Sequence, residues 1–240
     1  MSRSQATDLF NQAWATYRTV LEHNLMENRQ VAEAIAGEID HWLTRRTARA
    51  QAPRLVDLGC GDLALLPPLL RRLPLASYTG LDLAPVVLPL AREALGPVPF
   101  ATHWLEGDLL SWARHPDGEV TDILLSSFAI HHLEDGQKAL FLEGARQRID
   151  PEGVFLWADV FRQPGEGREA SVRRYGERIA GGWQVLDADQ QRRTIEHVLT
   201  FDHPADRAEI QSVAEAAGWQ WRWAWQGLHR AEALAVLTPA

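Results

Sequence analysis

The sequence predicts an α/β fold with a doubly wound, mostly parallel sheet, and three features support this. Short apolar runs alternate with segments of helical periodicity between residues 51 and 160. The first run, residues 55–58, leads into a turn that holds two glycines, Gly59 and Gly61. A second run closes at Asp82, at about the 20-residue spacing where such folds place a carboxylate on a ribose. Strands separated by helices pair in parallel through right-handed crossovers.

Length, charge and cysteine content limit the classes of function. The 240 residues suffice for one substantial core, so a single domain over residues 1–240 is expected. The 24 basic and 32 acidic residues give a net charge of −8, which argues against a nucleic-acid partner because phosphate binding needs a basic surface. Cys60 is the single cysteine, and no apolar run approaches the ~18 residues of a membrane span. We therefore expect a cytoplasmic monomer or homodimer that does not bind membranes.

The first 50 residues predict a helical cap. Apolar side chains recur at spacings of three and four over residues 4–47, without strand signals. The periodicity indicates two helices that are broken near residues 23–28.

Prolines set the expected helix starts in the first half of the core. Pro67 and Pro68 follow the glycine turn and cannot sit in a helix interior, so the helix there should begin near Pro67. The next helix is expected over residues 85–95, with Pro85 at its start and a kink or a short first segment at Pro89.

The second half of the core continues the alternation. Residues 121–126 are an apolar central strand that ends in two serines, at the crevice where open α/β sheets bind ligands. A helix is expected from Asp135 to about residue 148, and residues 153–160 form the fifth strand. These elements complete a predicted core of residues 51–160.

Residues 161–203 exceed a minimal fold of this class. They are rich in charge and glycine and predict two helices, 167–180 and 188–199. Their position at the carboxyl edge of the sheet makes the pair either a substrate lid or a surface excursion, and the sequence favours neither.

Residues 204–240 predict a helix, 205–217, followed by a β-hairpin. Four tryptophans recur at period two from Trp219 to Trp225, which on a strand places all four indoles on one face. Such a row can be a platform for bases, but the acidic chain favours core packing.

Three carboxylates accompany three predicted strands: Asp57, Asp82 and Asp108. A dinucleotide brings a pyrophosphate that binds helix N-terminal amides, and Asp57 would repel it. S-adenosylmethionine carries a sulfonium and an ammonium and no phosphate, so a neighbouring carboxylate suits it. The acids therefore favour S-adenosylmethionine as the cofactor.

Five motifs together resemble the class I S-adenosylmethionine-dependent methyltransferases, in both order and spacing. They are Val56-Asp-Leu-Gly-Cys-Gly61, Gly80-Leu-Asp-Leu83, Glu106-Gly-Asp-Leu109, Asp122-Ile-Leu-Leu-Ser-Ser-Phe-Ala-Ile-His-His-Leu133 and Ile149-Asp-Pro-Glu-Gly-Val154. The resemblance covers roughly residues 50–160. It implies a seven-stranded Rossmann-like sheet whose last strand is antiparallel, and methyl transfer to an oxygen, nitrogen or carbon of a small molecule.

The resemblance also implies a set of cofactor-binding residues. Asp82 would hold the ribose hydroxyls, Leu83 would pack on adenine, and Asp108 would read the adenine edge. The glycine turn and the end of the central strand would surround the methionine part. The full expected set is Asp57, Gly59, Cys60, Gly61, Asp82, Leu83, Asp108, Leu109, Ser126, Ser127 and Phe128.

Two adjacent histidines follow the central strand beside the expected sulfonium. Imidazole titrates near neutral pH, which makes His131 and His132 the candidates for proton removal. The resemblance favours His131 as the base or acceptor-orienting group, whereas His132 could instead bond main chain and hold the turn.

Asp159 and Arg162 are candidates for binding the acceptor. The resemblance makes Tyr17, His23 and Asn24 candidates for lining the pocket, and the alternative for these three is an amphipathic helix packed on the sheet. The alternative for Asp159 and Arg162 is that they pair with each other. No metal is expected, because adjacent histidines diverge on most backbones and no residues show zinc-like spacing.

Two other classes of function remain open. The glycine turn with Asp82 also satisfies a loose dinucleotide fingerprint, which would make the protein a nicotinamide-dependent oxidoreductase. A protein that binds S-adenosylmethionine without turnover is the other. A nucleic-acid methyltransferase is disfavoured by charge and by Ser127-Phe128-Ala129-Ile130 in place of an Asn/Asp-Pro-Pro-aromatic motif.

Overall fold

The computed structural model describes residues 15–45, 51–115 and 118–240. Its centre is a sheet of strand order β3-β2-β1-β4-β5-β8-β7. The bounds of these strands are β1 Arg54–Leu58, β2 Ser77–Asp82, β3 Ala101–Glu106, β4 Thr121–Ser127, β5 Ile149–Arg162, β7 Trp219–Gln226 and β8 Glu232–Pro239. Strands β1 to β5 are parallel, and β8 is antiparallel to both β5 and β7. The predicted sheet is therefore confirmed. A short strand that the sequence did not predict, β6 (Ala205–Asp206), also pairs with β5.

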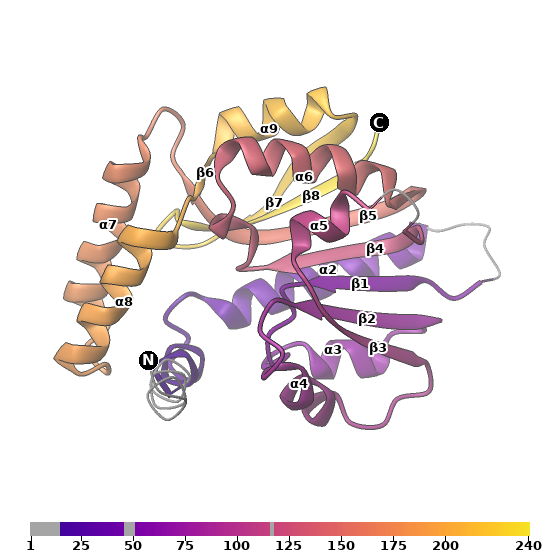
Figure 1. Cartoon of the computed structure of the whole chain (residues 1–240), viewed down its shortest axis with the longest axis horizontal. Coiled ribbons are helices and arrows are strands. Elements are labelled where there is room, and N and C mark those ends of the chain that lie inside the picture. Colours follow the sequence, from indigo (N-terminus) through magenta and orange to yellow (C-terminus); the bar gives the residue numbers. More distant parts are fainter. Residues whose placement is uncertain (1–14, 46–50, 116–117) are drawn as a thin grey trace.

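Helices cover both faces of the sheet (Figure 1). One face carries α2 (Asn28–Arg45), α3 (Pro67–Arg72) and α4 (Leu88–Leu95), and the other carries α5 (Leu109–Ala113), α6 (Asp135–Gln147) and α9 (Arg207–Ala216). Successive residues of β4 serve the two faces in turn, since Ile123 and Leu125 pack with the first layer and Leu124 with the second. The centre of the strand, Ile123 to Leu125, is apolar because both of its faces are buried.

Proline positions decide where two helices begin. Helix α3 begins at Pro67, as predicted. Helix α4 begins at Leu88, so the expected start at Pro85 is wrong. Pro89 stands in the first turn of α4, where its missing amide N–H costs no hydrogen bond.

The N-terminal cap is described from residue 15 onward. Residues 15–22 are helical and a turn over residues 23–26 leads to α2, so the predicted break between two helices is confirmed. The parts of the predicted cap in residues 1–14 and 46–50 lie outside the described residues. Among the helices that the structure describes, none is long and apolar enough to cross a membrane.

The segment after β5 folds as a helical pair, α7 (Arg168–Gly182) and α8 (Ala188–Phe201). The two helices stand beyond the carboxyl end of β5, apart from both helical layers (Figure 1). The predicted bounds agree with them to within two residues at each end. Glu232 on β8 ties the pair to the sheet, because its carboxylate accepts from the Tyr175 hydroxyl at 2.9 Å and from Arg178 at 2.6 Å.

The tryptophan row on β7 is divided between two cores. A bulge between Trp223 and Trp225 shifts the register, so the expectation that all four indoles share one face is wrong. Trp219 packs with Trp221 and Trp223 on the α6 and α9 side, whereas Trp225 packs on the α2 side. The prediction that the row serves core packing is confirmed.

This division predicts unequal costs for two substitutions on one strand. Trp219 is 1% exposed and its indole N–H donates to the Leu142 carbonyl at 3.0 Å. Trp219→Ala should therefore lower the free energy of unfolding by about 3–5 kcal/mol. The matched change Trp225→Ala, at a partly buried position, should cost about 1 kcal/mol. Urea denaturation measures both, and equal losses would contradict the assigned register.

Candidate active site

A cavity of about 690 Å³ opens at the carboxyl ends of β1, β2 and β3, and we call it the donor cleft. Most of the predicted cofactor residues line it: Asp57, Gly59, Cys60, Gly61, Asp82, Leu83, Asp108, Leu109, Ser127 and Phe128. Ser126 does not line it, because its buried hydroxyl donates to the Leu58 carbonyl at 2.9 Å and joins β4 to β1. Tyr17 and His132 complete the part of the lining that was predicted.

The glycine turn requires glycine at its first position. Gly59 has φ of +74°, and a Cβ there would lie 2.3 Å from the Cβ of Ala129. The amides of Gly59 and Cys60 donate to the Leu81 carbonyl at 2.8 and 3.0 Å, and so join this turn to β2. The turn is thereby pressed between two neighbouring strand ends, and its main chain lines the cleft.

Asp82 and Asp108 stand at the tips of adjacent strands. The Asp82 carboxylate accepts from the amides of Gly61 at 2.9 Å and Ala84 at 2.8 Å. Asp108 caps α5 by accepting from the Ser111 amide at 2.7 Å. A carboxylate has about four acceptor positions, so each retains capacity for hydroxyl or amino groups of a ligand.

Asp57 is a buried carboxylate with one oxygen left over. Its Oδ2 accepts from the Tyr78 hydroxyl at 3.0 Å, while its Oδ1 has no hydrogen-bond partner among the described residues. Burial raises the pKa of Asp57 to about 7, although the Tyr78 hydrogen bond opposes the shift. A cationic ligand in the donor cleft would satisfy this oxygen and favour its ionised form, so the cleft fits a cofactor with a positively charged end.

Cys60 lies in the donor cleft as a packing residue. Its Sγ would be 3.0 Å from a Cβ at Gly80, and burial raises the pKa of its thiol. A thiol held neutral is a poor nucleophile, so its contribution is volume beneath the ligand.

A second cavity of about 870 Å³ adjoins the donor cleft, and we call it the acceptor cavity. Its lining is mostly apolar and comes largely from α7 and α8. Four residues line both cavities: Tyr17, Val20, Met26 and Phe128. The two histidines are divided between them, since His131 lines the acceptor cavity and His132 the donor cleft.

His131 is fixed by Asp159 at the end of β5. Its Nδ1 is 2.6 Å from Asp159 Oδ1, and its amide donates to Oδ2 at 3.0 Å. Asp159 also accepts from the Trp157 indole at 2.9 Å. Burial alone would lower the pKa of His131, but the charges of Asp159 and Asp202 outweigh it and the pKa is raised. Burial would raise the pKa of Asp159, yet His131 and the hydrogen bonds lower it.

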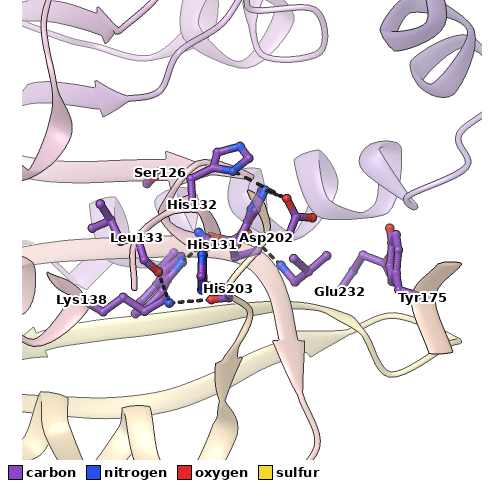
Figure 2. Close-up of polar contacts among 12 residues, drawn as sticks. Ser126, His131, His132, Leu133, Lys138, Tyr175, Asp202, His203 and Glu232 are labelled. Carbon is purple, nitrogen blue, oxygen red and sulfur yellow. Dashed lines mark hydrogen bonds and ion pairs between the residues drawn. The ribbon is translucent and has the colours of Figure 1, made fainter. Parts of the chain in front are cut away.

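His131 and His132 do not diverge, so that expectation is wrong. A short 3-10 helix, η1 (Ile130–His132), carries both, and their ring centroids are 4.1 Å apart. Figure 2 shows the two imidazoles next to each other and close to the Asp202 carboxylate. Burial, reinforced by the neighbouring His131, lowers the pKa of His132 to about 4.

Three residues near the cavities escaped the sequence analysis. Asp202 and His197 reach the acceptor cavity from the end of α8, and Asp62 lines the donor cleft and accepts from the Tyr17 hydroxyl at 3.3 Å. Asp62 directly follows the Gly-x-Gly turn, which is a usable signal. Asp202 and His197 carry no motif, because only the fold of the α7–α8 pair brings them to η1.

Besides Ser126, four predicted residues line neither cavity: Asp159, Arg162, His23 and Asn24. Asp159 acts instead through His131, to which it is hydrogen-bonded. Arg162 pairs with Asp135 at 2.9 Å and with Glu209 at 3.7 Å, so it meets neither an acceptor nor Asp159, and its assignment to the substrate site is wrong. His23 and Asn24 occupy the turn before α2 and line neither cavity.

The chain is similar to known proteins over most of its core. Residues 56–155 match the family model described as methyltransferase domain. The chain is 33% identical over 183 residues to demethylmenaquinone methyltransferase of Thermus thermophilus, which is 73% of this chain and 79% of that protein. It is 30% identical over 172 residues to carboxy-S-adenosyl-L-methionine synthase of Chromohalobacter salexigens, 68% of this chain and 62% of that protein. For this synthase and several other curated relatives the chain spans less than two thirds of their length.

Solved structures share the fold at low identity. The plantazolicin methyltransferase BpumL matches 99% of both chains with a TM-score of 0.64 and 11% identity. Human N-acetylserotonin methyltransferase matches 93% of this chain and 56% of its own, with a TM-score of 0.57 and 16% identity. At these identities the likeness concerns the fold alone.

The contact between Gly59 and Ala129 predicts a specific loss of ligand binding. Gly59→Ala should abolish the thermal stabilisation by S-adenosylhomocysteine, because the new Cβ would displace the turn that lines the donor cleft. Gly165 is the matched control, since it also has positive φ, +76°, but has open space around it. Gly165→Ala should cost only about 1 kcal/mol of stability and leave the ligand-induced shift unchanged. Ligand binding by Gly59→Ala at the wild-type level would refute the contact.

The raised pKa of Asp57 predicts pH-dependent binding. The pKa of Asp57 is raised on folding from 3.8, so ionising this carboxylate destabilises the ligand-free protein at pH values above 3.8. An ammonium group of the ligand offsets this destabilisation, but only when the carboxylate is ionised. The affinity for S-adenosylhomocysteine should therefore rise from about pH 6 to about pH 7.5, below the pKa of an α-amino group. Calorimetry over this interval measures it. Asp57→Asn should bind more weakly and remove the slope, and a variant that kept the wild-type slope would contradict the assignment.

Proposed function

Because the chain belongs to the class I S-adenosylmethionine-dependent methyltransferase family, we propose that it methylates a bulky, mostly apolar small molecule at oxygen, nitrogen or carbon. One observation carries the proposal. A donor cleft with carboxylates at three strand ends adjoins a larger apolar cavity, and four residues line both.

The donor cleft suits the cofactor of this family residue by residue. Asp82 would accept from the ribose hydroxyls, Leu83, which is 72% exposed, would cover the adenine, and Asp108 with the Leu109 amide would bind its edge. Asp57 would receive the ammonium on its unpartnered Oδ1. S-adenosylmethionine supplies a methyl group that is already activated by its sulfonium. The task of the protein is then to align the acceptor and to exclude water.

The acceptor cavity indicates the class of substrate. Its walls include Phe128, Phe161, Tyr175 and Trp183, and its apolar surface is suited to an aromatic or polycyclic body. Its polar lining includes His131 and Asp202. An acceptor that fits would carry a protic group on a largely apolar frame.

His131 is the side chain that the protic group would meet, as a base or as an orienting group. Its Nδ1 is held by Asp159, which leaves Nε2 on the side of Asp202 and the acceptor cavity. In the transfer, an electron pair of the acceptor atom forms the bond to the methyl carbon, and the carbon–sulfur bond breaks toward sulfur. The acceptor loses its proton on the His131 side, and S-adenosylhomocysteine is released.

The other classes of function predict different ligands. A nicotinamide-dependent oxidoreductase would place a pyrophosphate beside the buried Asp57, which disfavours it. A binding protein without turnover would have no use for an acceptor cavity that adjoins the donor cleft. The absence of a nucleic-acid partner, the cytoplasmic location and the state as monomer or homodimer remain predictions from the sequence.

The proposal is tested by methyl transfer from isotopically labelled S-adenosylmethionine to a panel of apolar phenols, quinols and aromatic amines, read by mass spectrometry. A labelled methylated product with an equal amount of S-adenosylhomocysteine is expected. Thermal stabilisation by S-adenosylhomocysteine and none by NAD should accompany it. Stabilisation by NAD instead would establish the oxidoreductase alternative.

A matched pair of variants separates the two cavities. Thr194 lines the acceptor cavity from α8, and Thr194→Phe should fill part of it and raise the acceptor KM at least about tenfold without changing S-adenosylhomocysteine affinity. Arg192 lies two residues away, is exposed and lines neither cavity, so Arg192→Phe should behave as wild type. Loss of S-adenosylhomocysteine affinity in Thr194→Phe would show that the acceptor cavity is misassigned.

A further inference from the structure

Three histidine nitrogens surround one carboxylate oxygen between the two cavities. Asp202 Oδ1 lies 3.6 Å from His132 Nδ1, 3.7 Å from His131 Nε2 and 3.7 Å from His197 Nε2. The first two contacts are seen in Figure 2. These residues come from η1 at the end of β4 and from α8 with the residue after it, segments about 70 residues apart in the chain.

None of these contacts is a hydrogen bond. A charge-assisted N–H···O bond spans about 2.7–2.9 Å, and all three distances exceed this. Asp202 is 7% exposed, and its Oδ1 has no hydrogen-bond partner within the described part of the chain. A buried carboxylate oxygen without a donor is costly, so a cationic ligand at this oxygen would be favoured.

The spacing fits ligands of one metal ion. Histidine nitrogens and carboxylate oxygens bind Zn²⁺ at about 2.0–2.2 Å, which places tetrahedral ligands about 3.4 Å from one another. The ligand atoms of His131, His132 and Asp202 all lie within 4.8 Å of one another. Two imidazoles and one carboxylate form a set that zinc, iron and cobalt accept with further positions open.

Hydrogen bonds around His131 support this assignment. The Nδ1 of a metal-binding histidine usually donates to a carboxylate, which fixes the tautomer and leaves Nε2 for the ion. His131 has this arrangement with Asp159 at 2.6 Å, and Asp159 is itself held by the Trp157 indole and the Val160 amide. Asp202 Oδ1, which has no hydrogen-bond partner among the described residues, lies 3.7 Å from His131 Nε2.

Asp202 is held beside η1 by the main chain that follows it. The His203 amide donates to the His131 carbonyl at 2.7 Å, and the His203 carbonyl accepts from Lys138 Nζ at 2.5 Å. Lys138 is fully buried and also donates to the Leu133 carbonyl at the end of η1 (Figure 2). Hydrogen bonds therefore join the segment that carries the Asp202 carboxylate to the segment that carries both imidazoles.

We propose that His131 Nε2, His132 Nδ1 and Asp202 Oδ1 bind one divalent transition-metal ion, with His197 at its edge. The ion joins the α7–α8 pair to the end of β4 and faces the acceptor cavity with its open positions. Resting on the proposed methyl transfer, His131 then orients the acceptor through the ion. Such an ion would lower the pKa of an acceptor hydroxyl bound to it, so that the hydroxyl would lose its proton to solvent more readily and become a better nucleophile.

The test is metal binding by the full chain. After treatment with a chelator, the protein is titrated with Co²⁺, and its visible d–d absorption and the metal content after gel filtration are measured. About one equivalent of Co²⁺ is expected, displaced by Zn²⁺. His132→Ala, at a half-exposed side chain, and Asp202→Asn should each weaken binding at least about tenfold. His103→Ala, at an exposed histidine on β3, is the control and should bind as wild type.

Two outcomes would overturn the proposal: less than about a tenth of an equivalent on wild type, or binding by His132→Ala equal to wild type. Should Asp202→Asn fail to fold, His132→Ala decides alone. S-adenosylhomocysteine affinity, measured on the same samples without metal, depends on the donor cleft. Failure of the metal site with intact cofactor binding is thereby distinguished from failure of the proposed methyl transfer.

Discussion

The buried hydrogen bond between Asp159 and His131 is the contact on which the arrangement of the site depends. It joins the end of β5 to η1, which follows β4, and so fixes the segment that separates the donor cleft from the acceptor cavity. Asp159 is stabilised as an anion by several donors at once, which offsets the cost of burying its charge. Because Asp159 holds the His131 imidazole at Nδ1, Nε2 is the ring nitrogen that can contact a ligand on the side of the acceptor cavity.

Three buried carboxylates in the described residues keep an oxygen without a hydrogen bond; two of them line a cavity, and the third, Glu232, lines neither. Asp57 and Asp202 each keep one oxygen without a hydrogen bond in the described ranges, and burial raises the pKa of both. Native proteins rarely leave such groups unsatisfied, so each is informative about a missing ligand. Asp57 lies in the donor cleft and suits an ammonium, whereas Asp202 lies among imidazoles and suits a metal ion. The same physical rule thus leads to two different ligands, because the neighbours of the two carboxylates differ.

The acceptor cavity is assembled from parts of the chain that are distant in sequence. Val20 comes from the N-terminal helix, Phe128 from the end of β4, Val160 from β5 and Trp183 from the end of α7. The donor cleft, in contrast, is built largely from strand ends and the turns after them. A new acceptor specificity can therefore arise by change in the helical additions, while the cofactor site keeps its strand-end geometry.

The sheet and most of the donor cleft could be predicted from the sequence alone. Strand ends, turns and their carboxylates are local features of the sequence. Because a parallel topology places these features at one edge of the sheet, the proximity of Asp57, Asp82 and Asp108 could be predicted. Some expectations from local sequence failed where tertiary contacts prevail. The bulge between Trp223 and Trp225 turns the Trp225 indole to the other face of the sheet, and Arg162 pairs with Asp135 and not with Asp159.

Only the tertiary structure decided what lies between the two cavities. The 3-10 turn that brings His131 and His132 side by side, and the approach of Asp202 from the end of α8, result from packing between segments with no common pattern. The hydrophobic periodicity and composition of a segment predict which of its faces is buried. They do not predict which residue of a distant element packs against that face. The cofactor site could be predicted from the sequence because its residues lie at successive strand ends. The acceptor site could be located only in the structure, because its residues come from segments that only the fold brings together.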